Sequence, residues 1–94
     1  MRTLFRNVSK PYEPEKAYRC PCCRFKTLHG RGQDEICKVC FREHDGQDNH
    51  DADEVRGGPN RFLSLTQGRL NFELCGASDT TFISNVRAPF PDEK

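Results

Sequence analysis

The clearest pattern of apolar and polar positions lies over residues 64–75, and it predicts a single helix. Ser64, followed three residues later by Gln67, predicts a capping box in which the hydroxyl and the side-chain amide satisfy backbone N–H groups at the helix start. Gly76 is a natural residue to follow the last turn. At about 100° per residue, the apolar side chains fall on two nearly opposite sides, Leu65, Phe72 and Cys75 on one and Leu70 and Leu74 on the other.

A helix with two apolar sides is either covered on both or keeps one side for a partner. We expect residues 77–90 to form an extended tail that covers the second side with Phe82, Ile83, Val86 and Phe90. Gly68 lies on the first side, where glycine costs about 1 kcal/mol relative to alanine, so a close backbone approach is expected there. Residues 91–94 are predicted to be a disordered C-terminus.

The pattern before the helix is shorter and less regular. Residues 17–44 hold five of the six cysteines and predict a compact module. Its short apolar stretches flank two tight cysteine turns, with glycines at 30 and 32 in the connector between them. We interpret these stretches as the arms of two β-hairpins, at residues 17–19 with 25–29 and at Ile36 with residues 41–43.

Two polar segments surround this module. Residues 1–16, with prolines among charged residues, predict a flexible basic arm. Residues 45–61 are rich in acids and poor in aliphatic residues, and predict a long acidic surface loop. The predicted fold class is a small, metal-stabilised α+β domain over residues 17–90, with zinc-ribbon-like β-hairpins and one C-terminal helix.

Composition explains why such a chain needs a metal. Leu, Ile, Val and Phe make up only 19 of 94 residues, which leaves little apolar area to bury. The chain shows no signal-peptide pattern and no apolar stretch that approaches a membrane span, so we expect a cytoplasmic protein and no membrane partner. Because thiols stay reduced there, six cysteines favour metal binding over disulfides or redox chemistry.

The cysteine spacing predicts which residues are the metal ligands. Cys20 and Cys23 form one C-x2-C pair, Cys37 and Cys40 form another, and thirteen residues lie between them. Two such turns can direct four thiolates at one Zn²⁺ in a closed, structural tetrahedron, and Fe is the alternative metal. Further candidates for weak or alternative ligands are Cys22, His29 and His44, whereas Cys75 fits a small apolar residue on the helix.

The net charge of +1 combines two opposite segments. Residues 1–32 hold eight basic and two acidic residues, and residues 33–56 hold three basic and eight acidic ones. The basic segment would suit nucleic acid, unless the acidic segment folds beside it. Carboxylates at positions 45, 48, 51 and 53 could hold a hard cation, but they do not follow EF-hand spacing, and a solvated acidic loop is the alternative.

The string Cys-Pro-Cys-Cys at 20–23 resembles the signature of the cysteine-rich CPCC family of small, mostly bacterial proteins. The resemblance extends over about residues 18–89, through the strings at 35–41, 45–48, 57–60, 64–65, 71–72, 76–78 and 86–89. It implies a cysteine-based metal site and no settled biochemical function. Four positions depart from the family pattern, namely Lys38, Arg42, His44 and Gly68. These departures weaken the inference of an acidic function for residues 43–45.

These observations predict a zinc-binding domain with a structural metal, which acts as a protein-interaction or accessory module. A nucleic-acid-binding zinc ribbon is the alternative, and a thiol or metal sensor that works through Cys22 is a lesser one. No H-E-x-x-H, G-x-S-x-G or phosphate-loop motif is present, so we expect no enzymatic activity.

Overall fold

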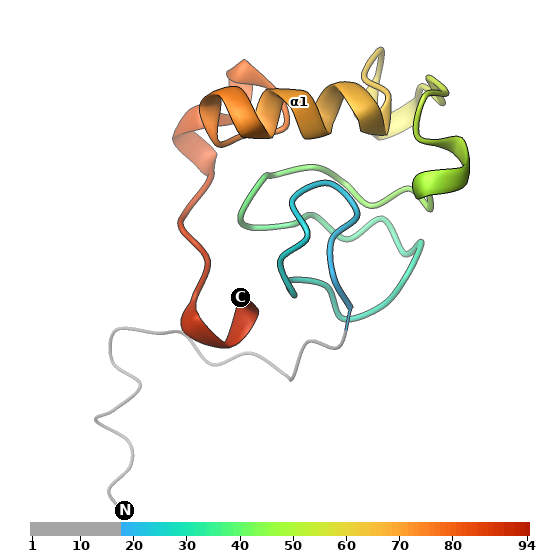
Figure 1. The fold of residues 1–94 in the computed structure, drawn as a ribbon. Helices are drawn as coiled ribbons and strands as arrows, with labels where there is room; N and C mark the ends of the chain where they lie inside the picture. The colour runs from blue at the N-terminus through green and yellow to red at the C-terminus, as the bar shows by residue number, and fades with distance from the viewer. Residues whose placement is uncertain (1–17) are drawn as a thin grey trace, which may run out of the picture.

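The computed structural model describes residues 18–94, so the predicted arm at 1–16 lies outside the described residues. Within these residues, five helical elements follow one another: η2 (Asn49–Asp51), η3 (Gly58–Asn60), α1 (Leu65–Cys75), η4 (Thr80–Asn85) and η5 (Pro91–Glu93). Figure 1 shows α1 lying across one side of the loops formed by residues 18–44, while the C-terminal segment returns along their edge to η5. No helix within residues 18–94 is both long and apolar enough to cross a membrane.

The prediction of zinc-ribbon-like β-hairpins is wrong. Between residues 18 and 94 there is no strand or sheet, and only two isolated antiparallel bridges occur, Tyr18 with Leu28 and Ile36 with Glu43. The reason lies in the backbone, because Gly32 (φ 64°) and Asp34 (φ 58°) adopt left-handed conformations directly before the second bridge. Left-handed residues cannot continue an extended strand, so the pairing of Ile36 with Glu43 does not grow into a strand on that side.

Local signals place α1 where the sequence predicts a helix. The Ser64 hydroxyl accepts the N–H of Gln67 at 3.1 Å, and Gly76 ends the helix with φ 80° and an N–H bond to the Phe72 carbonyl. The predicted capping box is only half formed, because the Gln67 amide donates to the Asn71 side chain instead of returning to Ser64. The N-cap hydroxyl alone therefore defines the helix start.

The inner side of α1 packs against the cysteine module through Leu65 and Gly68, both buried. A Cβ atom at Gly68 would lie 3.3 Å from Arg42 Nη1 and 3.4 Å from Cys22 Sγ. The close approach expected from this glycine is thus confirmed. It lets a buried guanidinium and a buried thiol lie directly against the helix backbone.

The outer side of α1 is not covered as expected. Leu70 is 47% exposed and Leu74 is 76% exposed. The following segment is not an extended tail throughout, since Thr80–Asn85 form η4, and Phe82 packs on Phe41 with ring centroids 5.1 Å apart. Phe82 is thus used against the cysteine module, Ile83 is itself 50% exposed, and Leu70 and Leu74 stay exposed on the outer face of α1.

The C-terminus also differs from the predicted disorder. Pro91–Glu93 form η5, and Glu93 is only 1% exposed. Its carboxylate receives two hydrogen bonds from Arg87, at 2.8 and 2.9 Å, and one from the Phe90 N–H at 2.8 Å. Its carbonyl accepts the Lys26 N–H at 2.7 Å. This last bond attaches the end of the chain to the first cysteine turn.

The core is small and rich in sulfur. Five buried cysteines form one cluster with three aliphatic side chains, Leu28, Val39 and Leu65, and with Ala52. Phe25 and Phe72 pack edge to face beside it, with centroids 6.4 Å apart. So little aliphatic area gives modest hydrophobic stabilisation, which makes the cysteines central to the fold.

Candidate metal centre

The two cysteine turns have the same backbone construction. In the first, the Cys20 carbonyl accepts the Arg24 N–H at 2.8 Å, and the Cys20 N–H donates to the Phe25 carbonyl at 2.8 Å. In the second, Cys37 makes the matching bonds with Phe41 and Arg42, at 2.8 and 2.9 Å. Arg24 (φ 72°) and Phe41 (φ 67°) are the left-handed residues that allow each turn to close.

The turns bring together the four cysteines predicted as ligands. The Sγ atoms of Cys20, Cys23, Cys37 and Cys40 all lie within 4.8 Å of one another, and all four residues are buried. Across the turns, Cys20 and Cys40 are 3.7 Å apart, and Cys23 and Cys37 are 3.6 Å apart. Four sulfurs bound to zinc at about 2.3 Å would form a tetrahedron with edges of about 3.8 Å. The four thiols therefore already have the dimensions of a tetrahedral metal site.

Polar neighbours support negative charge at this site. Thr27 Oγ1 donates to Cys37 Sγ at 3.0 Å, and the Cys40 N–H points to the same sulfur at 3.5 Å. Such bonds stabilise a thiolate and orient it. No local sequence signal identifies Thr27, whose side chain reaches the sulfurs from beside the bridge between Tyr18 and Leu28.

Without a metal the four thiols compete for protons. Hydrogen bonding to the Cys20 and Cys23 sulfurs lowers the pKa of the Cys37 thiol, whereas hydrogen bonding to Cys20 above all raises the pKa of Cys40. Close sulfurs cannot all be thiolates unless a cation balances their charge. A divalent metal would supply that balance and displace the shared protons.

Cys22 does not belong to the four-sulfur group. Its side chain is buried at 4% exposure and lies against Gly68 of α1. It also lines a hollow of about 290 Å³ beside Arg24 and Arg69. The structure thus places Cys22 between the first turn and the helix, where it serves packing.

The other candidate ligands have different partners. His29 Nδ1 lies 2.6 Å from a Glu35 carboxylate oxygen. His44 is buried, its backbone pairs with residues 34 and 35, and burial lowers the pKa of its imidazole. Cys75 points its thiol toward the Ala77 carbonyl at 3.5 Å. None of the three joins the four-sulfur group.

The acidic loop does not form a second cluster. Asp48 pairs with Arg31 at 2.6 Å, Asp51 pairs with Arg56, and Asp53 accepts the Thr66 hydroxyl. Among residues 18–94, the four cysteines are the only group of three or more neighbouring potential ligands. The carboxylates thus hold the loop against the rest of the domain and gain no support as a hard-cation site.

Arg42 is a further residue whose role the sequence does not reveal. Its guanidinium is buried and donates to Gln47 Oε1 at 2.6 Å and to the Ser64 carbonyl at 3.4 Å. Asp45 lies 3.8 Å away as its nearest counter-charge. Arg42 therefore links the second cysteine turn to the acidic loop and to the start of α1. A basic residue after a C-x2-C pair carries no signal for such burial.

Fold and site together define a small protein built around four convergent buried cysteines, compatible with metal binding. A family model described as Cysteine-rich CPCC matches residues 18–93. The chain belongs to the cysteine-rich CPCC family, and the resemblance drawn from its motifs is confirmed. Comparison with curated proteins and with solved structures gives no match.

Proposed function

We propose that the four cysteines hold a structural zinc ion, and that the domain this ion stabilises is a non-catalytic protein-interaction module. Four thiolates occupy every position of a tetrahedral zinc, so no position remains for substrate or water. Both zinc and iron suit four sulfurs, and zinc binds such ligands more tightly than Fe²⁺. The metal would contribute folding free energy, while the surface would carry the function.

One observation supports the interaction role, namely the apolar outer face of α1. Leu70 and Leu74 are one helical turn apart and both are exposed, at 47% and 76%. Burying a leucine side chain contributes about 1.5–3 kcal/mol. Two such residues on one helix face suit the apolar groove of a partner protein, which is a common mode of helix recognition.

This role can be tested with the double variant Leu70→Gln/Leu74→Gln. Glutamine keeps helix propensity and charge, so fold and metal content should remain unchanged. We expect the zinc-loaded wild type to retain a specific protein from an extract of its source organism, and the double variant to bind that protein at least 10-fold more weakly, consistent with two lost contacts.

Gln67→Ala provides the matched control, because Gln67 is an exposed polar residue of the same helix. Its affinity for the partner should equal that of the wild type. A double variant that binds as well as the wild type, or a wild type that retains no protein, would contradict the proposed role of this face.

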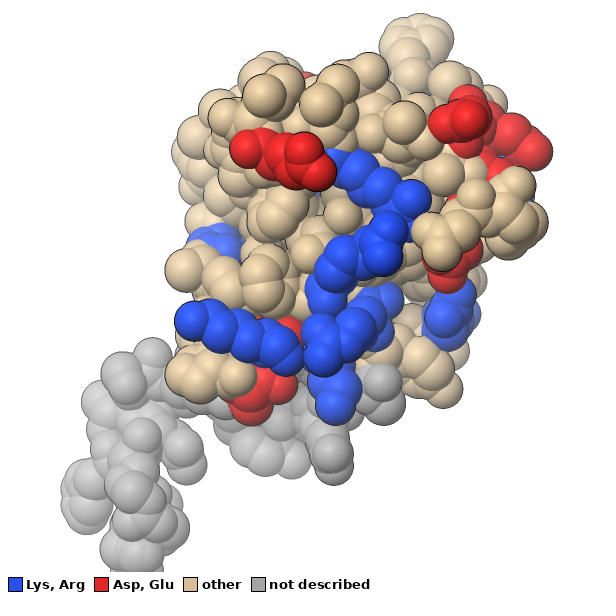
Figure 2. Space-filling view, in the orientation of Figure 1, with Lys and Arg blue, Asp and Glu red and all other residues tan. Residues whose placement is uncertain are grey.

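A second candidate function is nucleic-acid binding, which one surface feature favours. Figure 2 shows Lys and Arg side chains as a nearly continuous band across one face. Hydrogen bonds gather basic residues around the first cysteine turn, where Arg19 donates to the carbonyls of Arg24 and Lys94, and Arg69 donates to that of Pro21. Among the described residues of the basic segment, 18–32, Arg31 forms an ion pair with Asp48 at 2.6 Å. Such a band could contact phosphates without reading bases.

Arg24→Gly tests this candidate without straining the backbone, because Arg24 has the positive φ that glycine prefers. If the band binds nucleic acid, a 20-nucleotide single strand should shift the protein in a gel at about 50 mM salt and lose binding steeply as salt rises. Arg24→Gly should weaken binding, whereas Arg61→Gly, a matched change at another positive φ, should not. Absence of a shift at low salt would exclude the candidate.

A further inference from the structure

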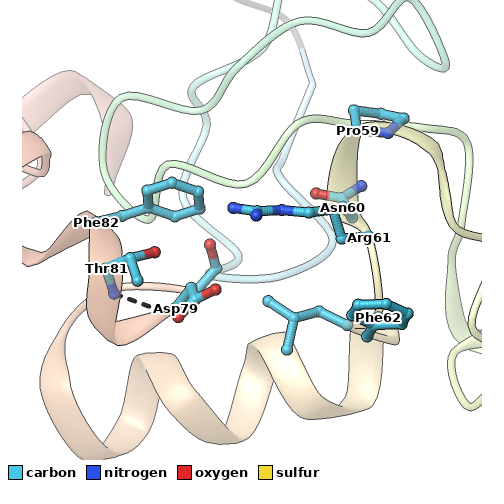
Figure 3. A pocket seen from close by; sticks show the side chains of 9 residues that line it. Pro59, Asn60, Arg61, Phe62, Asp79, Thr81 and Phe82 are labelled. Atoms are coloured by element: carbon cyan, nitrogen blue, oxygen red, sulfur yellow. Dashed lines mark hydrogen bonds between the residues drawn. The ribbon is translucent and has the colours of Figure 1, made fainter.

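We propose that the hollow between η3 and η4 is a docking site for a partner's peptide segment in which an internal Asp or Glu stands beside a large apolar side chain. This inference rests on the proposed interaction role and names the chemistry of what is bound. The hollow has a volume of about 230 Å³, which suits a single anchoring side chain. In Figure 3 the side chains of Arg61, Phe62, Asp79 and Phe82 surround it.

Apolar side chains line the hollow from both sides, among polar ones. Leu63 and Phe82 are half-buried, and Phe62 is 88% exposed at the rim. Phe82 is held in place by its packing on Phe41, with centroids 5.1 Å apart, and Phe41 belongs to the second cysteine turn. The wall is therefore anchored to the metal centre and is formed before any ligand arrives.

Arg61 provides the charge for recognition. Its side chain is directed into the hollow in Figure 3, toward Phe82 and Asp79. Within residues 18–94 no carboxylate or carbonyl pairs with this guanidinium. An arginine can bind a carboxylate with two parallel hydrogen bonds, and Arg61 is exposed, so an incoming carboxylate can reach it.

The backbone holds Arg61 in an unfavourable conformation. Its φ of 52° and ψ of −116° follow two left-handed glycines, Gly57 and Gly58, and its N–H donates to the Gly58 carbonyl at 3.1 Å. A residue other than glycine costs roughly 1–3 kcal/mol in such a region. Glycine would relieve this cost, so an arginine here indicates a use for the side chain.

Asp79 does not form the ion pair with Arg61 that we propose for the partner's carboxylate. Its carboxylate caps η4 by accepting the Thr81 N–H at 3.2 Å, and the Thr80 hydroxyl lies 3.5 Å from the same oxygen. It makes no ion pair with Arg61 in the described part of the chain. The guanidinium therefore keeps its donors for a second carboxylate. These unused hydrogen bonds, rather than net charge, favour an acidic segment, because Asp79 also lines the hollow and balances its net charge.

The experiment uses the zinc-loaded full chain and a displayed library of random peptides. We expect enrichment of sequences in which Asp or Glu neighbours Phe, Leu, Ile or Trp. A selected peptide, made with acetylated and amidated ends, should shift the NMR signals of residues around Arg61 and Phe82. Binding by the blocked peptide would show that an internal acid is read, whereas binding only by a free carboxyl end would overturn the proposal in this form.

Arg61→Gly is the decisive variant, because it removes the guanidinium and also relieves the positive φ. We expect its thermal stability to match or exceed that of the wild type, and its affinity for the selected peptide to fall at least 10-fold. Arg24→Gly, which deletes an arginine at another positive φ, should bind the peptide normally.

Three results would overturn this inference: no enriched peptide, enriched peptides without an acid, or equal binding by Arg61→Gly. These failures are distinguishable from failure of the proposed function, which depends on different side chains, Leu70 and Leu74. If the outer face of α1 binds a partner while the hollow binds no peptide, the interaction role stands and this site does not.

Discussion

Replacement of Cys37 by serine is expected to abolish stoichiometric metal binding and to unfold the cysteine module. Cys37 Sγ accepts the Thr27 hydroxyl, lies 3.6 Å from Cys23 Sγ and belongs to the four-sulfur group. A structural zinc contributes an apparent 10–16 kcal/mol, about as much as the whole stability of a typical domain (roughly 5–15 kcal/mol). Native mass spectrometry should detect no bound ion, and the dispersed NMR signals of residues 18–44 should collapse.

Two further cysteines provide controls for this result. Cys22→Ser and Cys75→Ser should keep one metal ion per chain, since neither residue belongs to the four-sulfur group. Removing the metal from the wild type with a strong chelator should reproduce the spectrum of Cys37→Ser. A Cys37→Ser protein that still binds one ion and keeps its dispersion would refute this ligand set, as would loss of metal from Cys22→Ser.

Glu93→Ala is expected to be the most destabilising change outside the ligands. It removes a buried carboxylate that accepts two hydrogen bonds from Arg87 and one from the Phe90 N–H. Breaking a fully buried pair costs about 3–5 kcal/mol, and the partial exposure of Arg87 reduces this to roughly 2–3 kcal/mol. In a domain of this size the melting temperature should fall by about 10–20 °C.

The metal content of the variant distinguishes the stabilising role of Glu93 from a role in metal binding. Glu93→Ala should still bind one metal ion per chain, because the carboxylate does not touch the sulfurs. Glu73→Ala serves as the control, because it deletes an exposed carboxylate on α1 and should leave the melting temperature nearly unchanged. Equal melting temperatures for the two variants would show that η5 does not stabilise the domain.

The features predicted well from the sequence are those set by neighbours in the chain. The C-x2-C spacing determines which thiols can share an ion, and the Ser64 hydroxyl with Gly76 determines where α1 begins and ends. Gly68 also predicted a close approach to the helix, because glycine inside a helix costs stability and is expected where a neighbour leaves no room for a side chain. Each of these signals acts within a few residues or one helical turn.

The features that were missed depend on contacts between distant segments. Nothing near Glu93 shows that its carbonyl will meet Lys26, and nothing near Arg42 shows that its guanidinium will lie under Gly68. The β-hairpins were predicted because short apolar stretches flank each turn, but left-handed Asp34 interrupts the extended backbone. Asparagine and aspartate tolerate this conformation better than most residues, so Asp34 after Gly32 was the available signal.

The matching cysteine turns have a consequence for the order of assembly. Each turn closes through bonds between residues only four or five apart, so each can form in the unfolded chain without the rest of the fold. The connector between Cys23 and Cys37 is thirteen residues long, and a loop of about ten residues closes in roughly 10–100 ns. The chain can thus bring its four thiols together far faster than a scarce ion diffuses to them. We therefore expect newly synthesised chains to mature at a rate set by the supply of metal.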